Sequence, residues 1–405
     1  MSKKLSLALV AALLSGTPAF ANCAFKNETP VKAYFAAFPA WKIIADAMKE
    51  CGNVTVELDQ EIRTKGPAAF AANPALYHVG YVHNGTIVPL LSQGTIRPLD
   101  SLVAKYGQHL KPNQLIKIDG KIMAIALMVN TQYLQYRKDI FDKLKIPVPQ
   151  TYDDVLAAAK TIKDAGVVQY PLGATLKADW NIGIEFNNMF AGYDGKYVNA
   201  DNTPAINSEA GLKTLEMMKK LTEYLDPEYL TADATFVQKQ FQQEKIAFAN
   251  FWASRAASLN DPKESRVAGK IATASAPSAV KGGVPAVQFS WDAIAIAKNI
   301  TDAEAEAAFR VVLEGADTET VQKNNDVAVW LVEGYKPGPA AKGAIETLDN
   351  NARPAPSTVW RGLIDTAISQ NVGDFLLGKR SAPDTLKKIE ADYVVAAKEA
   401  GLLKR

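Results

Sequence analysis

Aromatic side chains recur in this sequence beside short polar groups, at positions where strands or helices are expected to begin or end. Flat apolar rings stack on the faces of sugar rings, whereas sugar hydroxyls need amide, imidazole or charged partners. The pairing of the two residue types therefore predicts a site for a carbohydrate-like ligand. The candidate residues are Trp41, Tyr81, His83, Asn84, Asp179, Trp180, Asn250, Trp252, Arg255, Trp291, Asp292, Arg353 and Trp360.

These candidates differ in how well a plain structural role explains them. Trp252 is the strongest, because polar side chains flank it on both sides. Trp291 and Asp292 fit packing between segments equally well, and any single tryptophan fits a core position about as well as a binding site. Arg255 and Arg353 fit surface salt bridges, but a guanidinium also suits a carboxylate, sulfonate or phosphate. The sequence therefore leaves the charge of the ligand open.

The motifs of several enzyme classes are absent from the 405 residues. There is no G-x-S-x-G elbow, no P-loop and no G-x-G-x-x-G, so acyl transfer, nucleotide hydrolysis and dinucleotide binding have no signature. The only histidines, His78, His83 and His109, lack the spacing of metal ligands, and we expect neither a metal nor a cofactor. Carboxylate pairs are abundant, which keeps a secreted carbohydrate-active enzyme open as an alternative.

The N-terminus has the pattern of a secretory signal peptide. Lys3 and Lys4 precede an apolar run at 5–14, and the A-F-A tripeptide at 19–21 supplies a small-x-small cleavage pattern, which predicts a signal peptide over residues 1–21. The apolar run is about half of the roughly 20 residues that a membrane span needs, so we expect export to a bacterial periplasm. Loss of the two lysines takes the formal charge from +2 to 0, which leaves no basic excess for nucleic acid.

The two cysteines, Cys23 and Cys51, lie 28 positions apart in the expected mature chain. In an oxidising compartment this pair favours one disulfide over two buried thiols. A bridge of that span stabilises a fold by roughly 3 kcal/mol, because it restricts the unfolded chain. We therefore expect the mature N-terminus to be pinned to the end of the first helix.

Strand and helix patterns alternate through the N-terminal third of the chain. Apolar runs of strand length occur at 31–35, 54–58 and 76–82, and a helical spacing of apolar residues spans 41–48. Such alternation predicts an α/β fold with a mainly parallel sheet that helices cover on both faces. In sheets of this kind, ligands bind beyond the carboxyl ends of the strands, where residues 36–41 and 81–84 are expected.

The segment 124–165 marks the point where the chain is expected to leave the first sheet. An apolar strand is followed by the polar residues 130–132, a short helical segment and a Pro-Val-Pro break at 147–149. Thr151 then caps a new helix, since Asp154 stands three residues later in the position of a capping box. This order predicts a polar hinge between two lobes.

The same order resembles the best-marked signature of family 1 extracellular solute-binding proteins, the sugar-binding receptors of ABC importers. In that family the segment usually reads YNKDLF followed by P-x-T-W-D-E-L, and here 136–141 reads YRKDIF and 149–155 reads PQTYDDV. The segment 244–250, EKIAFAN, is similar to a further strand of the family that usually reads F-x-x-G-K-A-A-M. Arg137 and Glu244 depart from the pattern, because they replace its asparagine and its glycine.

The resemblance implies a two-lobed α/β periplasmic binding protein fold, type II-like, with the lobes interleaved through three hinge crossings. The expected N-terminal lobe comprises residues 22–128 and 291–352, and the expected C-terminal lobe comprises 129–290 and 353–405. The crossings would then fall where these four segments meet.

The resemblance also implies the function of a periplasmic substrate-binding component. We expect it to bind a mono- or oligosaccharide or polyol between its lobes, as a monomer, and to deliver that ligand to the transmembrane subunits of an ABC permease. Neither catalysis nor a cofactor is expected. Two alternatives stay open: a binding protein for an anionic sugar derivative or organic acid held by Arg255 or Arg353, and a secreted carbohydrate-active enzyme.

Overall fold

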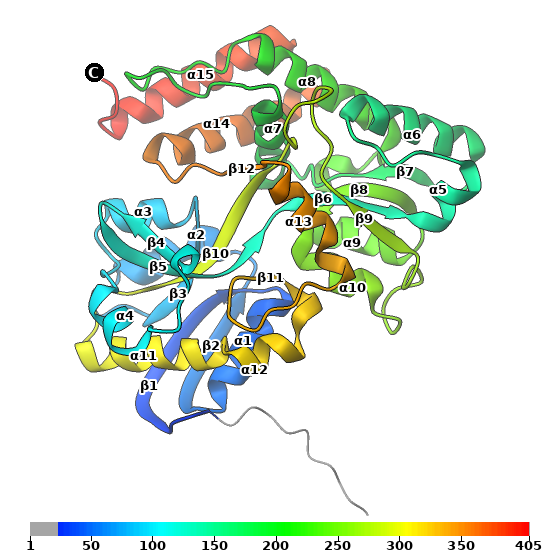
Figure 1. The fold of residues 1–405 in the computed structure, drawn as a ribbon. Coiled ribbons are helices and arrows are strands. Elements are labelled where there is room, and N and C mark those ends of the chain that lie inside the picture. Colours follow the sequence, from blue (N-terminus) through cyan, green and yellow to red (C-terminus); the bar gives the residue numbers. More distant parts are fainter. Residues whose placement is uncertain (1–22, 405) are drawn as a thin grey trace, which may run out of the picture.

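Two β-sheets divide the described part of the chain into two lobes (Figure 1). The structure is a computed structural model that describes residues 23–404, so the expected signal peptide at 1–21 lies outside the described residues. The first sheet has eight strands and the second has four. The elements around them are called here the first lobe and the second lobe. No helix within residues 23–404 combines the length and the apolar character that a bilayer crossing requires.

The first lobe is built around the eight-stranded sheet. Its strands follow the order β11-β5-β10-β3-β1-β2, with β4 beside β5 and β12 beside β10. Helices α1 and α11 pack against β2 and β1 and against each other, and they cover the lobe's main apolar core. The strand bounds are β1 (Asn27–Ala36), β2 (Gly52–Asp59), β3 (Val79–His83), β4 (Leu115–Ile118), β5 (Lys121–Asn130), β10 (Gln288–Ile296), β11 (Val329–Trp330) and β12 (Arg353–Pro354). The helices are α1 (Pro39–Lys49), α2 (Ile62–Ala71), α3 (Ile87–Ser92), α4 (Asp100–Tyr106), α11 (Asp302–Gly315) and α12 (Thr318–Lys323).

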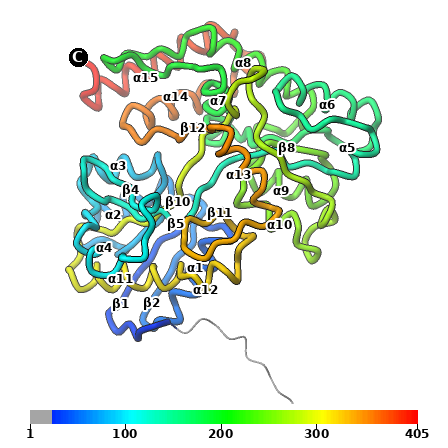
Figure 2. Tube along the Cα trace, in the orientation of Figure 1, coloured from blue at the N-terminus to red at the C-terminus, as the bar shows by residue number. Residues whose placement is uncertain are grey.

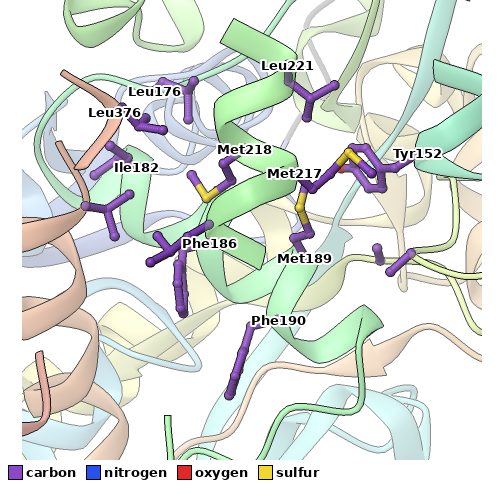
Figure 3. Close-up of a cluster of buried hydrophobic side chains, with 14 of the residues drawn as sticks. Tyr152, Leu176, Ile182, Phe186, Met189, Phe190, Met217, Met218, Leu221 and Leu376 are labelled. Carbon is purple, nitrogen blue, oxygen red and sulfur yellow. The ribbon is translucent and has the colours of Figure 1, made fainter. Parts of the chain in front are cut away.

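The second lobe is built around the four-stranded sheet, in the order β7-β8-β6-β9. Its largest apolar core joins α7 and α8 to the C-terminal helices, and Figure 3 shows Phe186 of α7 beside Met218 of α8. The strands are β6 (Gln132–Arg137), β7 (Tyr170–Gly173), β8 (Ile246–Trp252) and β9 (Ile271–Ala274). The helices are α5 (Lys138–Leu144), α6 (Tyr152–Ala165), α7 (Trp180–Gly192), α8 (Glu209–Leu221), α9 (Ala234–Gln242), α10 (Ala256–Asn260), α13 (Lys342–Asp349), α14 (Val359–Leu376) and α15 (Ala382–Glu399).

The expectation of a mainly parallel sheet is wrong for the first lobe. β1 runs parallel to β2 and β3, but β10 runs antiparallel to β3 and β5, the strands on either side of it in the main strand order. The reason lies in the chain path, because β3 and β5 end at the junction of the lobes, whereas β10 arrives from the second lobe and starts there. A strand that begins at this edge of the sheet is antiparallel to neighbouring strands that end at the same edge.

Local capping chemistry fixes the helix that follows the first crossing. Thr151 Oγ1 accepts a hydrogen bond from the backbone N–H of Asp154 at 3.2 Å, and Asp154 Oδ2 accepts one from the N–H of Thr151 at 2.9 Å. At the other end of α6, Gly166 adopts a left-handed φ of 60°, which ends the helix at little steric cost. The predicted capping box and helix are therefore confirmed.

The chain passes between the sheets more than once (Figure 2). β5 ends at Asn130 and β6 begins at Gln132, so the first crossing is a single residue long. The second crossing joins β9 to β10, and the short β12 then pairs with the first two residues of β10. Helix α13, part of the segment expected in the N-terminal lobe, packs against β6 and β9 of the second sheet.

A disulfide joins Cys23 to Cys51, with their Cα atoms 4.9 Å apart, and confirms the predicted pairing. Cys51 immediately precedes β2, and its carbonyl accepts a hydrogen bond from the N–H of Asn27 at the start of β1. The bridge therefore ties the start of the described chain to the edge of the first sheet. Neither cysteine lines the cavity between the lobes.

We expect the Cys23→Ser/Cys51→Ser double variant to lose about 3 kcal/mol of unfolding free energy, because the unfolded chain regains the entropy that the bridge removes. Urea titration of the variant and of the oxidised parent measures the difference. Ligand binding by the folded variant should match the parent, since the bridge is remote from the cavity. An unchanged unfolding midpoint would contradict this stabilising role.

Candidate functional site

A cavity of about 210 Å³ lies between the two lobes and is lined by residues of both. The crossing strand β10 and the segment after β12 form part of its wall. Many of the residues that the sequence singled out meet here, although they are spread over more than 200 positions of the chain. The sequence-predicted residues that line the cavity are Tyr81, His83, Asn84, Asp179, Trp180, Trp252, Arg255 and Asp292.

On the first-lobe side, two neighbouring strands present the polar groups. β3 pairs with β10 so that His83 lies opposite Asp292 in the antiparallel register. Tyr81 stands two residues before His83 and therefore lies on the same face of the sheet. The Tyr81 Oη donates a hydrogen bond to Asp292 Oδ1 at 2.8 Å. These three side chains form a buried polar wall.

On the second-lobe side, a helix start and a strand end supply the lining. Asp179 caps α7 by accepting a hydrogen bond from the N–H of Asn181 at 2.8 Å, and Trp180 is the first residue of that helix. β8 ends at Trp252, and Arg255 follows in the next turn. Two indole rings and a guanidinium therefore line this side.

Burial sets the charge of the polar wall. Asp292 is 2% exposed, and its burial raises its pKa to about 7. Burial also raises the pKa of Tyr81 well above 10 and lowers that of His83 well below 6.5, so both side chains are neutral at pH 7. His83 Nδ1 accepts a hydrogen bond from the N–H of Gly85 at 3.1 Å, which places the imidazole proton on Nε2. The wall thus offers a neutral N–H donor beside a carboxyl group.

Several buried polar atoms of the lining have no hydrogen-bond partner among residues 23–404. They are His83 Nε2, Asn130 Oδ1, Asn181 Oδ1, Gln288 Oε1, Asp292 Oδ2 and Arg361 Nη1. A buried polar group without a partner costs about 1–3 kcal/mol, so such a concentration in one cavity suits a ligand that carries many hydroxyl groups. Within the same residues, no cluster of three or more His, Cys, Asp or Glu side chains is arranged to hold a metal ion.

Two predicted tryptophans lie near the cavity without lining it. Trp41 is fully buried in the first-lobe core, and its ring meets the ring of Tyr81 edge to face at 5.4 Å. Trp291 is half-buried and packs against a smaller apolar cluster on the other face of the first sheet. Trp41 therefore supports Tyr81 from behind.

Three further predicted residues are engaged elsewhere in the second lobe or at the junction. Asn250 Nδ2 donates to Gln132 Oε1 at 3.4 Å. Arg353 pairs with Asp194, and its Nη1 donates to the carbonyl of Ala191 at 3.1 Å. Trp360 packs against the second-lobe core. None of the three lines the cavity between the lobes.

The chain matches one family model over residues 31–319, that of the bacterial extracellular solute-binding proteins. The match covers more than half of the chain. This chain belongs to that family. The resemblance predicted from the motifs around Thr151 and Glu244 is thereby confirmed.

Solved structures of solute-binding proteins share the fold of this solute-binding protein. An ABC transporter solute-binding protein of Agrobacterium radiobacter K84, in complex with ribitol, has a TM-score of 0.81 at 21% identity, over 92% of this chain and 100% of that chain. A counterpart from Agrobacterium vitis S4 with bound D-mannitol has a TM-score of 0.76 at 20% identity, over 92% and 99%. Maltose-bound MalE3 of T. maritima has a TM-score of 0.77 at 16% identity, over 91% and 99%. The predicted two-lobed α/β fold is therefore confirmed.

Two arginines of the solute-binding protein line the cavity and were missed by the sequence analysis. The guanidinium of Arg63, at the start of α2 in the first lobe, lies 4.1 Å above the ring of Trp180 in the second lobe. Arg361 is 3% exposed, and its Nε donates to Asp365 Oδ1 at 2.6 Å. The sequence did contain a signal for Arg361, because Asp365 follows it by four positions and Trp360 precedes it. No local signal marks Arg63.

Side-chain amides hold the crossing segments of this solute-binding protein in place. Asn84 lines the cavity, but its Oδ1 accepts hydrogen bonds from Ser290 Oγ at 2.8 Å and Trp291 N at 3.0 Å, and its Nδ2 donates to the carbonyl of Ala355 at 2.8 Å. The side chain thus joins the end of β3 to β10 and to the segment after β12. These three hydrogen bonds therefore hold the junction together.

A second amide network links the first crossing to the second. Asn188 Oδ1 accepts a hydrogen bond from the N–H of Gln288 at 2.8 Å, and its Nδ2 donates to Gln132 Oε1 at 3.0 Å. Gln132 Nε2 in turn donates to Glu185 Oε1 at 2.8 Å. Burial raises the pKa of Glu185 to about 7. The junction therefore contains a second carboxyl group that resists ionisation.

Stability should depend on pH through Asp292 and Glu185. Their folded-state pKa values of about 7 lie above the reference values of 3.8 and 4.5, so the folded protein holds protons that the unfolded chain releases. The stability that they contribute is full below about pH 4 and is lost as the pH rises toward 7.

We therefore expect Asp292→Asn and Glu185→Gln each to gain unfolding free energy relative to the parent as the pH rises from 4.5 to 8. Denaturant titrations across that range measure the relative change. Asp119→Asn, at an exposed turn position, is the control and should track the parent. A constant difference between variant and parent across the range would contradict the buried titration.

Proposed function

We propose that this protein is the periplasmic substrate-binding component of an ABC importer and that it binds a neutral sugar or polyol between its lobes. The observation that carries the proposal is the cavity itself, where tryptophan rings and unpartnered buried hydrogen-bonding atoms of both lobes meet. Ribitol, D-mannitol and alpha-D-tagatose in structurally similar binding proteins support the same ligand class. The cavity of about 210 Å³ favours a single sugar or alditol over a long oligosaccharide.

The proposed mechanism is closure of the lobes around the ligand. The stacking of Arg63 on Trp180 spans the cavity, and the amides of Asn84 and Asn188 hold the crossings about which the lobes would turn. We propose that α13 moves with the second lobe, because it packs on that lobe's sheet. Closure would create the surface that the permease recognises.

The remaining parts of the proposal concern the setting of the protein. Membership of an extracellular solute-binding family and the predicted signal peptide at 1–21 support a periplasmic location. Delivery to the transmembrane subunits of a permease, action as a monomer and the lack of enzymatic activity are further parts of the proposal, and the same family membership supports them. An enzyme would release chromophore from chromogenic glycosides, whereas the proposed function gives binding without turnover.

A thermal-shift screen of residues 22–405 against alditols, monosaccharides and short oligosaccharides tests the ligand class. A ligand at a hundredfold excess over its dissociation constant should stabilise the protein by about 2.7 kcal/mol. Trp252→Ala should weaken that binding by at least about tenfold through lost ring contact, whereas Trp252→Phe should retain most of it. A screen without any stabilising sugar or polyol would contradict the proposal.

Of the two arginines that the sequence assigned to an anionic ligand, Arg255 lines the cavity, together with Arg63 and Arg361, whereas Arg353 lies outside it and pairs with Asp194. For a neutral ligand, we expect Arg255→Ala to change the ligand affinity by less than about tenfold. We also expect the affinity to vary little between roughly 0.05 and 0.5 M salt, because no ion pair with the ligand is there to be screened. Arg353→Ala is the matched control and should leave affinity unchanged. A steep loss of affinity with salt, abolished by Arg255→Ala, would instead establish an anionic ligand.

A further inference from the structure

Asp292 is the most buried carboxylate of the cavity lining, and it has no ion-pair partner within residues 23–404. Asp179 pairs with Lys177 at 3.2 Å, and Asp365 pairs with Arg361 at 2.6 Å. Asp292 is more buried than Asp179, yet the groups that interact with its oxygens are neutral: the Tyr81 hydroxyl donates to Oδ1, and the Asn130 amide lies beside the carboxyl. A buried carboxyl without a countercharge is expensive to ionise, so its presence at the site calls for an explanation.

The groups around Asp292 leave one direction open. From β3, Tyr81 donates to Oδ1 and His83 lies opposite as a neutral ring. From β5, the neighbours in the register are Met128 and, toward the junction, Asn130, which carry no charge. Within residues 23–404, the cation whose charge lowers the pKa of this carboxyl is Arg63, which stacks on Trp180. Oδ2 has no partner among the described residues, and Asp292 lines the cavity.

We propose that Asp292 selects the ligand by charge: its Oδ2 accepts a hydrogen from a hydroxyl or ammonium group of a polyol and excludes a carboxylate from that position. The inference rests on the proposed function, which it deepens by naming the ligand's chemistry at one subsite. Above about pH 7, where Asp292 is ionised, a carboxylate there would place two acceptors and two negative charges against each other in a site of low polarity. A hydroxyl or ammonium group supplies the donor that Oδ2 lacks.

The same contact links binding to a proton. A ligand hydrogen bond favours the ionised carboxyl, because both oxygens then receive a hydrogen, Oδ1 from Tyr81 and Oδ2 from the ligand. The carboxyl proton leaves for the buffer as the ligand enters. The affinity for a neutral polyol should therefore fall as the pH drops below about 7, the value near which the free Asp292 titrates.

Matched ligands that differ at one carbon test the charge selection. D-Glucitol, D-gluconate and D-glucamine share a skeleton and carry a hydroxyl, a carboxylate and an ammonium group at one end, and D-mannitol with D-mannonate forms a second set. Calorimetric titration at pH 7.5 should show each alditol, or the amine, binding at least about tenfold more tightly than the acid of its set. At pH 6, alditol binding in two buffers of different ionisation enthalpy should release a fraction of a proton per ligand.

Two variants separate the carboxyl from its surroundings. Asp292→Asn keeps the size of the side chain and an oxygen for the Tyr81 hydroxyl, and it should abolish proton release and reduce the discrimination against acids to less than about threefold. Tyr81→Phe retains the carboxyl and should retain discrimination, which guards against a folding defect in the first variant. If the acids bind as tightly as the alditols, or if alditol binding at pH 6 releases no proton, this inference is wrong while the proposed function still stands. Absence of binding by every probe would count against both this inference and the proposed function.

Discussion

The amide of Asn84 makes the contact on which the geometry of the site depends. At the end of β3 it receives hydrogen bonds from Ser290 and Trp291 and donates one to Ala355. It thereby fixes where β10 enters the first sheet, and the register of β10 decides that Asp292 lies opposite His83. Asn188 positions the start of β10 from the second lobe, because its Oδ1 accepts a hydrogen bond from the N–H of Gln288. A shift of β10 by one residue would turn Asp292 to the other face of the sheet.

The sequence predicted the parts of the fold that local chemistry decides. The capping box at Thr151, the signature segments around it and the pairing of two cysteines in an exported chain all depend on residues that are close in sequence or few in number. The direction of β10 was missed, because it depends on a strand that returns from the other lobe. Periodicity identifies a strand, but it carries no information about which edge the strand enters from.

The rule that ligands bind at strand ends identifies the neighbourhood of the cavity, but it does not decide which side chains line it. Tyr81 and Trp252 lie near the carboxyl ends of β3 and β8, whereas Asp292 lies in the first half of β10, and all three line the cavity. Trp41 obeys the same rule, yet its ring turns into the core beneath Tyr81. Arg63 belongs to a helix with no pattern of its own, and only the approach of the two lobes brings it to Trp180.

The contact between Arg63 and Trp180 is too weak to hold the lobes closed by itself. A cation–π pair at a partly exposed site contributes about 0.5–1 kcal/mol, whereas moving a two-state equilibrium from mostly open to mostly closed takes about 5.5 kcal/mol. The unpartnered atoms of the lining can supply that difference, since each buried group that gains a partner recovers about 1–3 kcal/mol. Atoms of this kind lie in both lobes and at the crossing, as His83, Asn181 and Gln288 show. A ligand that satisfies them in both lobes at once therefore favours the closed arrangement, and one that reaches only a single lobe does not.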